Sequence, residues 1–498
     1  MAGSSHRAVL RAAVLVVLLG LIAAPLGRGR AAGGSDVADL DRFVRGRLAA
    51  ARLPGMGLAI TRGSETVLVR GYGKDAGGAP ITPETRFRVA SLSKSFTAFA
   101  VMRRVEAGQI GLDQPVRRYL PGFRLADPAG ARITVRELLN QTSGLGDGGF
   151  LRIARDQQTS LAGRVADLRQ AHLVDAPGRA FHYCDLNYQV LGRVLEVVSG
   201  RPLSDELRRS VFEPLGMRDT VSVPTAQEGL RVVPRLARGG IVVYGLPVGR
   251  VELHGLVGGS GGVITSARDM TRWLRLHAGE PSGLLSAAGM RTLHTPPPGV
   301  DGGYAMGWFS PEGAPPRLEH NGVLSTFYAD QVVLPGSRVG IALLYPVNDA
   351  LADTSGIKEG VIALMTGRRP AAARIPDGRV TAVLLGILTL GSVVLRTRAL
   401  LRLRRWTDRA RGRDRWRTLV LTVPQIAWPV APAVLVLALP RLMLLLTGRA
   451  FSYTQLFLSM PAVETWLVSA GVLGLALGTA RIVALPRRPA RYRSPEDR

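Results

Sequence analysis

Three long apolar segments, each bordered by arginine, lie in the C-terminal part of this 498-residue chain and constrain its fold more than any other feature. A helix of about 20 apolar residues can cross a bilayer, and a charged residue at its centre is costly. The second segment is therefore expected to end before Arg441. The sequence predicts transmembrane helices at residues 380–395, 418–439 and 462–480.

Arginine is distributed unevenly around these segments. Residues 396–417 carry ten arginines and two aspartates, and the tail after residue 485 is also basic, whereas residues 447–461 hold only Arg449. Because basic loops remain on the cytoplasmic side, the basic loop and tail should be cytoplasmic and residues 447–461 should lie outside. Three spans then place residue 370 outside the cytoplasm.

The N-terminus indicates the same orientation. Residues 1–34 contain four arginines, no acidic residue and an apolar run, as expected of a signal peptide or an N-terminal anchor. The net charge of +27 is concentrated beside apolar segments, with +4 in residues 1–34 and +16 in residues 368–498. This pattern favours a lipid bilayer as partner and no nucleic acid. The arginine bias also suggests a bacterial source.

A Ser-x-x-Lys pattern provides the first chemical signal. Ser91 and Lys94 are three residues apart at the predicted start of a helix, so both side chains share one face. Only three of the 64 Lys and Arg residues are lysine. Lysine can act as a general base and arginine cannot, and the positive end of the helix dipole favours a neutral Lys94. The alternative is a helix N-cap with a solvated lysine.

The surrounding residues 87–97, from Phe87 to Thr97, resemble the signature of the serine β-lactamase-like hydrolases. This family includes class C β-lactamases, D-alanyl-D-alanine carboxypeptidases and esterases. The similarity continues through residues 105–110 and 133–139 to Thr142-Ser143-Gly144-Leu145, and it covers about residues 36–370. The resemblance implies an α/β (α+β) fold, with an antiparallel sheet flanked by helices and an all-helical domain.

Together these features predict five regions. They are a signal peptide or anchor (1–34), a β-lactamase-like hydrolase domain (35–367), a linker (368–379), a membrane region (380–485) and a basic cytoplasmic tail (486–498). Within the hydrolase domain, residue spacing predicts helices at 37–51 and 186–199, strands at 57–61 and 66–70, and a hairpin of residues 327–334 and 339–344.

The resemblance assigns roles to residues of three motifs. Ser91 would form the acyl-enzyme, while Lys94 and Tyr183 would share the proton transfers, with the choice of base left open. Tyr183 could instead be a core tyrosine. No metal and no cofactor are implied.

The remaining site residues come from the second and third motifs. Asp185 follows Tyr183, and His320 with Gly322 matches the third motif, so both Asp185 and His320 would face the substrate. The backbone N–H groups of Ser91 and Val323 would hold the oxyanion. His320 could instead be a surface histidine before a strand.

Two of these residues depart from the family pattern. Asp185 replaces the usual asparagine, which removes an amide donor, and an ionised Asp185 would favour a charged Lys94. His320 replaces the lysine of β-lactamases and so removes a permanent cation. Efficient β-lactam hydrolysis is therefore disfavoured, whereas ester and amide substrates remain open.

The sequence thus predicts a multi-pass cell-membrane protein with an extracytoplasmic serine hydrolase domain. It would act through an acyl-serine on a small-molecule or peptide substrate containing a peptide-like amide or an ester. A D-Ala-D-Ala carboxypeptidase-like activity on cell-wall peptides is one version of this hypothesis. The alternative is a catalytically weak binding or sensory module coupled to the membrane region.

Overall fold

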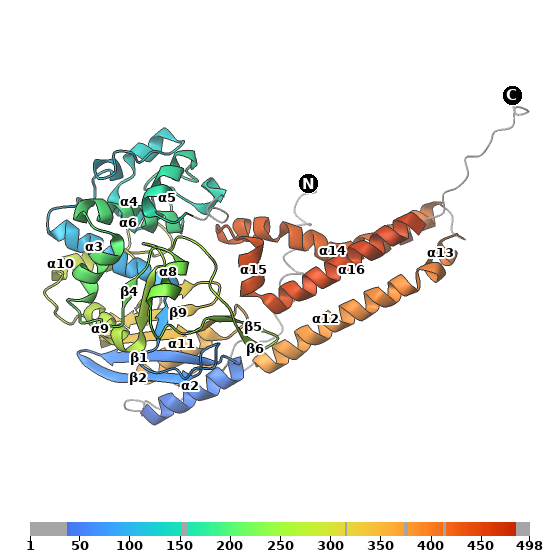
Figure 1. The fold of residues 1–498 in the computed structure, drawn as a ribbon, viewed down its shortest axis with the longest axis horizontal. Helices are drawn as coiled ribbons and strands as arrows, with labels where there is room; N and C mark the ends of the chain where they lie inside the picture. Colours follow the sequence, from blue (N-terminus) through green and yellow to red (C-terminus); the bar gives the residue numbers. More distant parts are fainter. Residues whose placement is uncertain (1–36, 152–157, 314–315, 373–376, 412–414, 485–498) are drawn as a thin grey trace, which may run out of the picture.

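The structure is a computed structural model that describes residues 37–151, 158–313, 316–372, 377–411 and 415–484. The predicted signal segment (1–34) and the basic tail (486–498) lie outside the described residues. Figure 1 shows a body built of sheets and helices, from which long C-terminal helices project to one side.

The core of the body is a five-stranded antiparallel sheet with strand order β2-β1-β10-β9-β8. The strands are β1 (Gly55–Arg62), β2 (Glu65–Gly73), β8 (Leu318–Val323), β9 (Tyr328–Leu334) and β10 (Val339–Tyr345). The first two strands and the β9–β10 hairpin were predicted from strand-like runs joined by turn residues, and both are present.

Side-chain alternation along the strands divides the core into two layers. Leu58 and Ile60 face helices α2 (Val37–Ala51) and α11 (Thr354–Met365), whereas Ala59 faces the opposite layer. That layer contains α3 (Ser93–Glu106), α6 (Asp185–Ser199) and α9 (Ala267–His277). Phe96 of α3 stacks on Trp273 of α9, with ring centroids 3.9 Å apart.

Helices also form a layer of their own beside α3 and α6, which agrees with the predicted all-helical part. Its other members and neighbours are α4 (Val135–Leu139), α5 (Leu161–Asp167), α7 (Leu203–Leu207) and α10 (Ala287–His294). Helix α8 (Ala226–Val232) instead accepts a hydrogen bond from Arg88 at its Ala226 carbonyl. The predicted helix 186–199 corresponds to α6, and Gly200 ends it in the left-handed conformation with φ +67°.

Two three-stranded sheets complete the body. One has the order β3-β7-β4 and the other β11-β5-β6. Their strands are β3 (Arg86–Arg88), β4 (Val221–Ser222), β5 (Gly240–Val243), β6 (Leu246–Gly249), β7 (Val263–Ser266) and β11 (Val347–Asn348). The chain therefore has the expected α/β fold with an antiparallel sheet, followed by a C-terminal helical region.

Three C-terminal helices are long and apolar enough to cross a membrane. The candidate spans are Gly378–Leu401 (α12), Val423–Thr447 within α14 (Arg415–Thr447) and Pro461–Ala484 (α16). The predicted span boundary before Arg441 does not coincide with a helix end, because α14 continues six residues beyond Arg441. Arg441 is exposed near that end of the helix, where a long side chain can reach the interface.

The connections between these helices are themselves partly helical. The basic segment 396–417 contains the last turns of α12, helix α13 (Leu403–Arg411) and the start of α14. The short connection from α14 to α16 contains α15 (Tyr453–Ser459). This connection, residues 448–460, is called the α14–α16 loop below.

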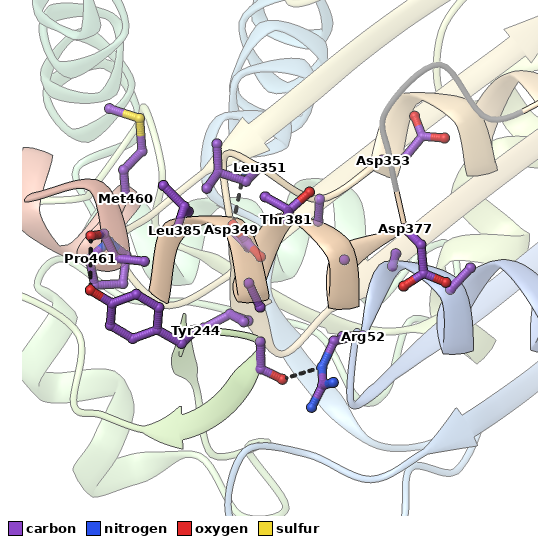
Figure 2. Close-up of a pocket in the computed structure, with 18 of the residues that line it drawn as sticks. Arg52, Tyr244, Asp349, Leu351, Asp353, Asp377, Thr381, Leu385, Met460 and Pro461 are labelled. Atoms are coloured by element: carbon purple, nitrogen blue, oxygen red, sulfur yellow. Dashed lines mark hydrogen bonds between the residues drawn. The ribbon is translucent and has the colours of Figure 1, made fainter. Parts of the chain in front are cut away.

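The C-terminal helices contact the body at a junction shown in Figure 2. The Tyr244 hydroxyl lies 2.8 Å from Thr389 Oγ1 of α12 and donates to the Ala462 carbonyl of α16 at 3.4 Å. A cavity of about 130 Å³ lies there, and Met460 and Leu385 are among its lining residues. The body therefore contacts both the first and the third candidate span.

Candidate active site

Ser91 lies on a tight 3₁₀ turn, Ala90–Leu92, immediately before α3. Ala90 adopts a positive φ of +48°, which is uncommon for a residue other than glycine. The Ser93 hydroxyl holds this turn, because it donates to the Ala90 carbonyl at 2.6 Å and accepts from the Val263 N–H at 2.9 Å. The chain is thus fixed on both sides of Ser91.

Lys94 is completely buried beneath Ser91. Its ammonium donates to Ser91 Oγ at 3.0 Å, to Asp185 Oδ1 at 2.5 Å and to the Ser260 carbonyl at 3.1 Å. Burial alone would lower the pKa of Lys94, but Asp185 and next Tyr183 raise it and together outweigh burial, so the net pKa is raised. The expectation that the helix dipole makes Lys94 a free amine is therefore not met, whereas the opposing effect expected of Asp185 is present.

Asp185 is the first residue of α6 and lies between two cations. Its Oδ1 accepts from Lys94, and its Oδ2 accepts from Arg449 Nη2 at 2.8 Å. Burial would raise the pKa of Asp185, but these two positive charges hold it well below its usual value. The carboxylate therefore stays ionised.

Tyr183 and His320 lie on the substrate side of this ion pair. The Tyr183 ring centroid lies 4.9 Å from Lys94 Nζ and 5.9 Å from the His320 ring centroid. Burial, and next the charge of Lys94, lower the pKa of His320 to about 3. His320 is therefore a neutral imidazole, and it is not the surface histidine considered as the alternative.

The hydrogen bonds of His320 indicate its tautomer. Nδ1 lies 2.6 Å from the Asn321 carbonyl, which can only accept, so Nδ1 carries the proton. Nε2 lies 3.3 Å from the Tyr304 hydroxyl and accepts from it. His320 thus presents a fixed neutral ring to the site.

Gly322 and Val323 end strand β8 beside the Ser91 turn. A Cβ atom at Gly322 would lie 2.2 Å from the Val89 carbonyl oxygen, so only glycine allows β8 to approach this closely. The Val323 side chain is exposed and lines the same cavity as Ser91. The structure thus brings the residues predicted from three distant motifs to one place.

Besides Tyr304, three residues that bind the charged groups of this site were not predicted from the sequence. The Ser260 carbonyl is an acceptor for Lys94, and Asp147 and Arg449 form a second ion pair, with Arg449 Nε 2.9 Å from Asp147 Oδ2. A signal for Arg449 was present, because it is the single arginine in a segment expected on the side of the hydrolase domain. The position of Arg449 indicated only the membrane topology and not a place in the site.

Gln141 and Cys184 have supporting positions here. Gln141 Oε1 accepts from the Cys184 N–H at 3.0 Å and from Asn187 Nδ2 at 2.5 Å, which ties Gln141 to the start of α6. The buried Cys184 thiol donates to Asp147 Oδ1 at 3.2 Å. Burial raises the pKa of this thiol, so Cys184 is not an activated nucleophile.

A cavity of about 490 Å³ opens over Ser91. Ser91, Tyr183 and His320 line it from the body, and the α14–α16 loop forms another part of its wall. The loop residues that line it are Arg449, Ala450, Phe451, Gln455 and Ser459. The site can therefore admit an acyl group to a serine that is hydrogen-bonded to a buried ammonium.

Comparisons with known proteins agree with this arrangement. The family model described as Beta-lactamase matches residues 40–356. Penicillin-binding protein 4 of Amycolatopsis lactamdurans is 31% identical over 311 residues, which are 59% of this chain and 80% of the relative.

Solved structures show the same fold. An octameric penicillin-binding protein homologue from Pyrococcus abyssi superposes with a TM-score of 0.58 at 24% identity, covering 67% of this chain and 78% of the homologue. A D-alanine carboxypeptidase from Burkholderia cenocepacia gives 0.53 at 20% identity, covering 67% and 99%. From the family match, the relative and the fold together, the chain belongs to the Beta-lactamase family.

Proposed function

We propose that this protein is a membrane-anchored, extracytoplasmic serine hydrolase that acts on a peptide-like amide or an ester through an acyl-serine. The observation that carries the proposal is the 3.0 Å hydrogen bond between Lys94 Nζ and Ser91 Oγ at the wall of an open cavity. A serine becomes nucleophilic when a group beside it can receive or stabilise its proton.

The reaction would proceed in two steps. Ser91 Oγ attacks the acyl carbonyl, its proton passes to the Lys94–Tyr183 pair, and the leaving amine or alcohol departs with a proton. The N–H groups of Ser91 and Val323 stabilise the oxyanion. Water then attacks the acyl-serine, and Ser91 recovers its proton.

The residues of the site favour a substrate without a carboxylate beside its acyl group. His320 is uncharged, and the ammonium of Lys94 is already paired with Asp185. A substrate carboxylate therefore meets no free cation at the position where the family carries lysine. This supports amide and ester substrates over β-lactams.

The outside location follows from the arginine distribution and is supported by the contact of Arg449 with Asp185. This contact requires the α14–α16 loop to lie on the same side of the membrane as the hydrolase site. The strongly basic segment 396–417 is at the opposite ends of α12 and α14, so it would face the cytoplasm.

Labelling of the full-length protein in detergent tests the catalytic proposal. Intact-mass analysis after exposure to a fluorophosphonate should show one adduct on the wild type and none on Ser91→Ala. Cys184→Ala is the matched control and should still be labelled. A wild type that gains no adduct, or an adduct retained by Ser91→Ala, would refute the proposal.

A D-Ala-D-Ala carboxypeptidase-like activity is the version that an extracytoplasmic location favours, and one structural neighbour carries the name D-alanine carboxypeptidase. Incubation with a peptidoglycan pentapeptide stem should then release D-alanine in a Ser91-dependent manner. If p-nitrophenyl esters are hydrolysed but no D-alanine appears, this version is excluded.

The sensory alternative is favoured by one observation, the 2.5 Å ion pair between Lys94 and Asp185. Burial opposes the charged lysine, but this contact helps to keep the pKa of Lys94 raised. A lysine held in its charged form is a poor base for deacylation. A benzylpenicillin adduct that persists for hours at one per chain would favour this reading, and rapid turnover would exclude it.

A further inference from the structure

Resting on the proposed hydrolase function, we propose that Arg449 of the membrane region is a substrate-binding residue. It would donate to an amide carbonyl beside the scissile bond, in place of the amide that Asp185 lacks. The α14–α16 loop would thus form part of the active site, and the three spans would do more than anchor the protein.

The first argument is the hydrogen-bond geometry of Asp185. An asparagine at this position can accept from Lys94 with its oxygen and donate with its nitrogen. In this chain Oδ1 still accepts from Lys94, but the second position is an oxygen, Oδ2, which binds Arg449 Nη2 at 2.8 Å. The Arg449 guanidinium binds the oxygen that stands where an asparagine would have its amide nitrogen. It therefore supplies N–H donors next to the position of the missing amide.

The second argument is that Arg449 has donors to spare. A guanidinium carries five N–H groups. Within the described residues, Arg449 uses Nε for Asp147 and Nη2 for Asp185, and Nη1 makes no hydrogen bond. The Arg449 side chain is 26% exposed and lines the cavity together with Ser91. Its remaining donors are thus accessible to a bound acyl group.

The third argument is that the loop is held firmly. The Ala450 N–H donates to Asp147 Oδ2 at 3.0 Å, and the Ala350 N–H of the body donates to the Ser459 carbonyl at 3.2 Å. A capping box between Ser452 and Gln455 begins α15 between these two attachments. Arg449 is therefore presented to the site by a fixed segment.

The charges at the site agree with this role. Lys94 and Arg449 face Asp185 and Asp147, so the two cations are matched by two carboxylates. The Arg449 guanidinium also lies 5.0 Å from the Tyr183 ring centroid, a distance that allows a cation–π interaction. The loop does not fill the site, because a cavity of about 490 Å³ remains.

Two esters measure the proposed contact in the full-length protein. N-benzoylglycine p-nitrophenyl ester has an amide carbonyl next to its acyl group, and p-nitrophenyl acetate has none. The readout is the ratio of kcat/KM for the first ester to kcat/KM for the second. Arg449→Ala should lower this ratio about tenfold or more, as loss of a charged hydrogen-bond donor does.

Restoring the amide provides the second arm. In the Arg449→Ala background, Asp185→Asn should return the ratio to within about threefold of the wild type, because it supplies the donor and removes the unpaired carboxylate. Arg291→Ala, which removes an exposed arginine on α10, is the matched control and should leave the ratio unchanged. If Arg449→Ala does not fold, the double variant and Arg449→Gln, which keeps a neutral donor, still give the ratio.

Each remaining outcome decides against the proposal. An unchanged ratio in Arg449→Ala would overturn it, and so would an equal loss on both esters, which would indicate a docking role only. A lowered ratio that Asp185→Asn fails to restore would also overturn it. Absence of any Ser91-dependent p-nitrophenol release would instead refute the hydrolase function itself.

Discussion

The carboxylate of Asp185 lies 2.5 Å from the ammonium of Lys94, so the amine nearest to Ser91 is held in its charged form. An asparagine would hydrogen-bond to the same lysine without adding a negative charge. The chain therefore combines the hydrolase lysine with a partner that opposes its use as a base. This relationship makes the pH dependence of acylation the most informative property of the site.

Asp185→Asn should move the acid limb of acylation to lower pH. Burial lowers the pKa of Lys94 and the Asp185 charge raises it, so removing that charge leaves burial to act. The Lys94–Tyr183 pair can then accept a proton from Ser91 at lower pH. The second-order rate of fluorophosphonate labelling, measured from pH 5 to pH 10, tests this shift. A shift to higher pH would contradict it.

A second prediction concerns orientation in the membrane. Thr454 of α15 and Arg405 of α13 are both exposed, and they should lie on opposite sides. A membrane-impermeant maleimide added to intact cells should label Thr454→Cys, whereas Arg405→Cys should react only after permeabilisation. The natural Cys184 is buried, so the unsubstituted chain is the background control. Equal labelling of both variants before permeabilisation would contradict the proposed topology.

Local sequence patterns predicted the fold well because each depends on neighbouring residues. The spacing of Leu40, Val44 and Leu48 gives the buried face of α2, and the turn residues Arg62-Gly63-Ser64 separate the two runs that form β1 and β2. The end of α14 was not predicted, because an arginine does not interrupt a helix and its insertion cost is largest at the centre of a span. The cost of burying Arg441 in a membrane therefore does not indicate where the helix ends.

Only those site residues that lie within the motifs could be predicted from the sequence. Ser91 and Lys94 meet across three residues of one turn, and Tyr183 and His320 followed from resemblance. The contact between Asp185 and Arg449 spans 264 residues and depends on how the C-terminal helices pack against the body. Neither periodicity nor motif spacing indicates such a contact, since nothing in the α14–α16 loop resembles the family pattern.

A third prediction is that His320 weakens the protein in acid. Its pKa is lowered to about 3 by burial and by the Lys94 charge, while an unfolded histidine titrates near 6.5. Between these values the unfolded state binds the extra proton, so the free energy of unfolding decreases as pH falls through this window. From pH 6.5 to 4.5 the contribution is about 2 kcal/mol for this one group.

His320→Gln should therefore show a flatter acid dependence than the wild type. The thermal midpoint of the full-length protein in detergent, measured at pH 6.5, 5.5 and 4.5, tests this. His277 and His294 are also buried neutral, so the wild-type curve should keep part of its slope in the variant. Identical slopes in both proteins would show that His320 does not contribute.

The fourth prediction concerns the close approach of β8 to the nucleophile turn. Gly322→Ala would place a Cβ 2.2 Å from the Val89 carbonyl oxygen and 3.0 Å from the Ala90 Cβ. The backbone must then separate, which moves the Val323 N–H away from Ser91 and spoils the proposed oxyanion site. A displacement of about 1 Å is expected to slow acylation about 100-fold.

Gly336→Ala is the matched control, because a Cβ there meets no atom within 4 Å. Fluorophosphonate labelling rates should separate the two variants, while size-exclusion profiles should show both folded. Equal rates would mean that the approach of β8 to Val89 serves packing alone.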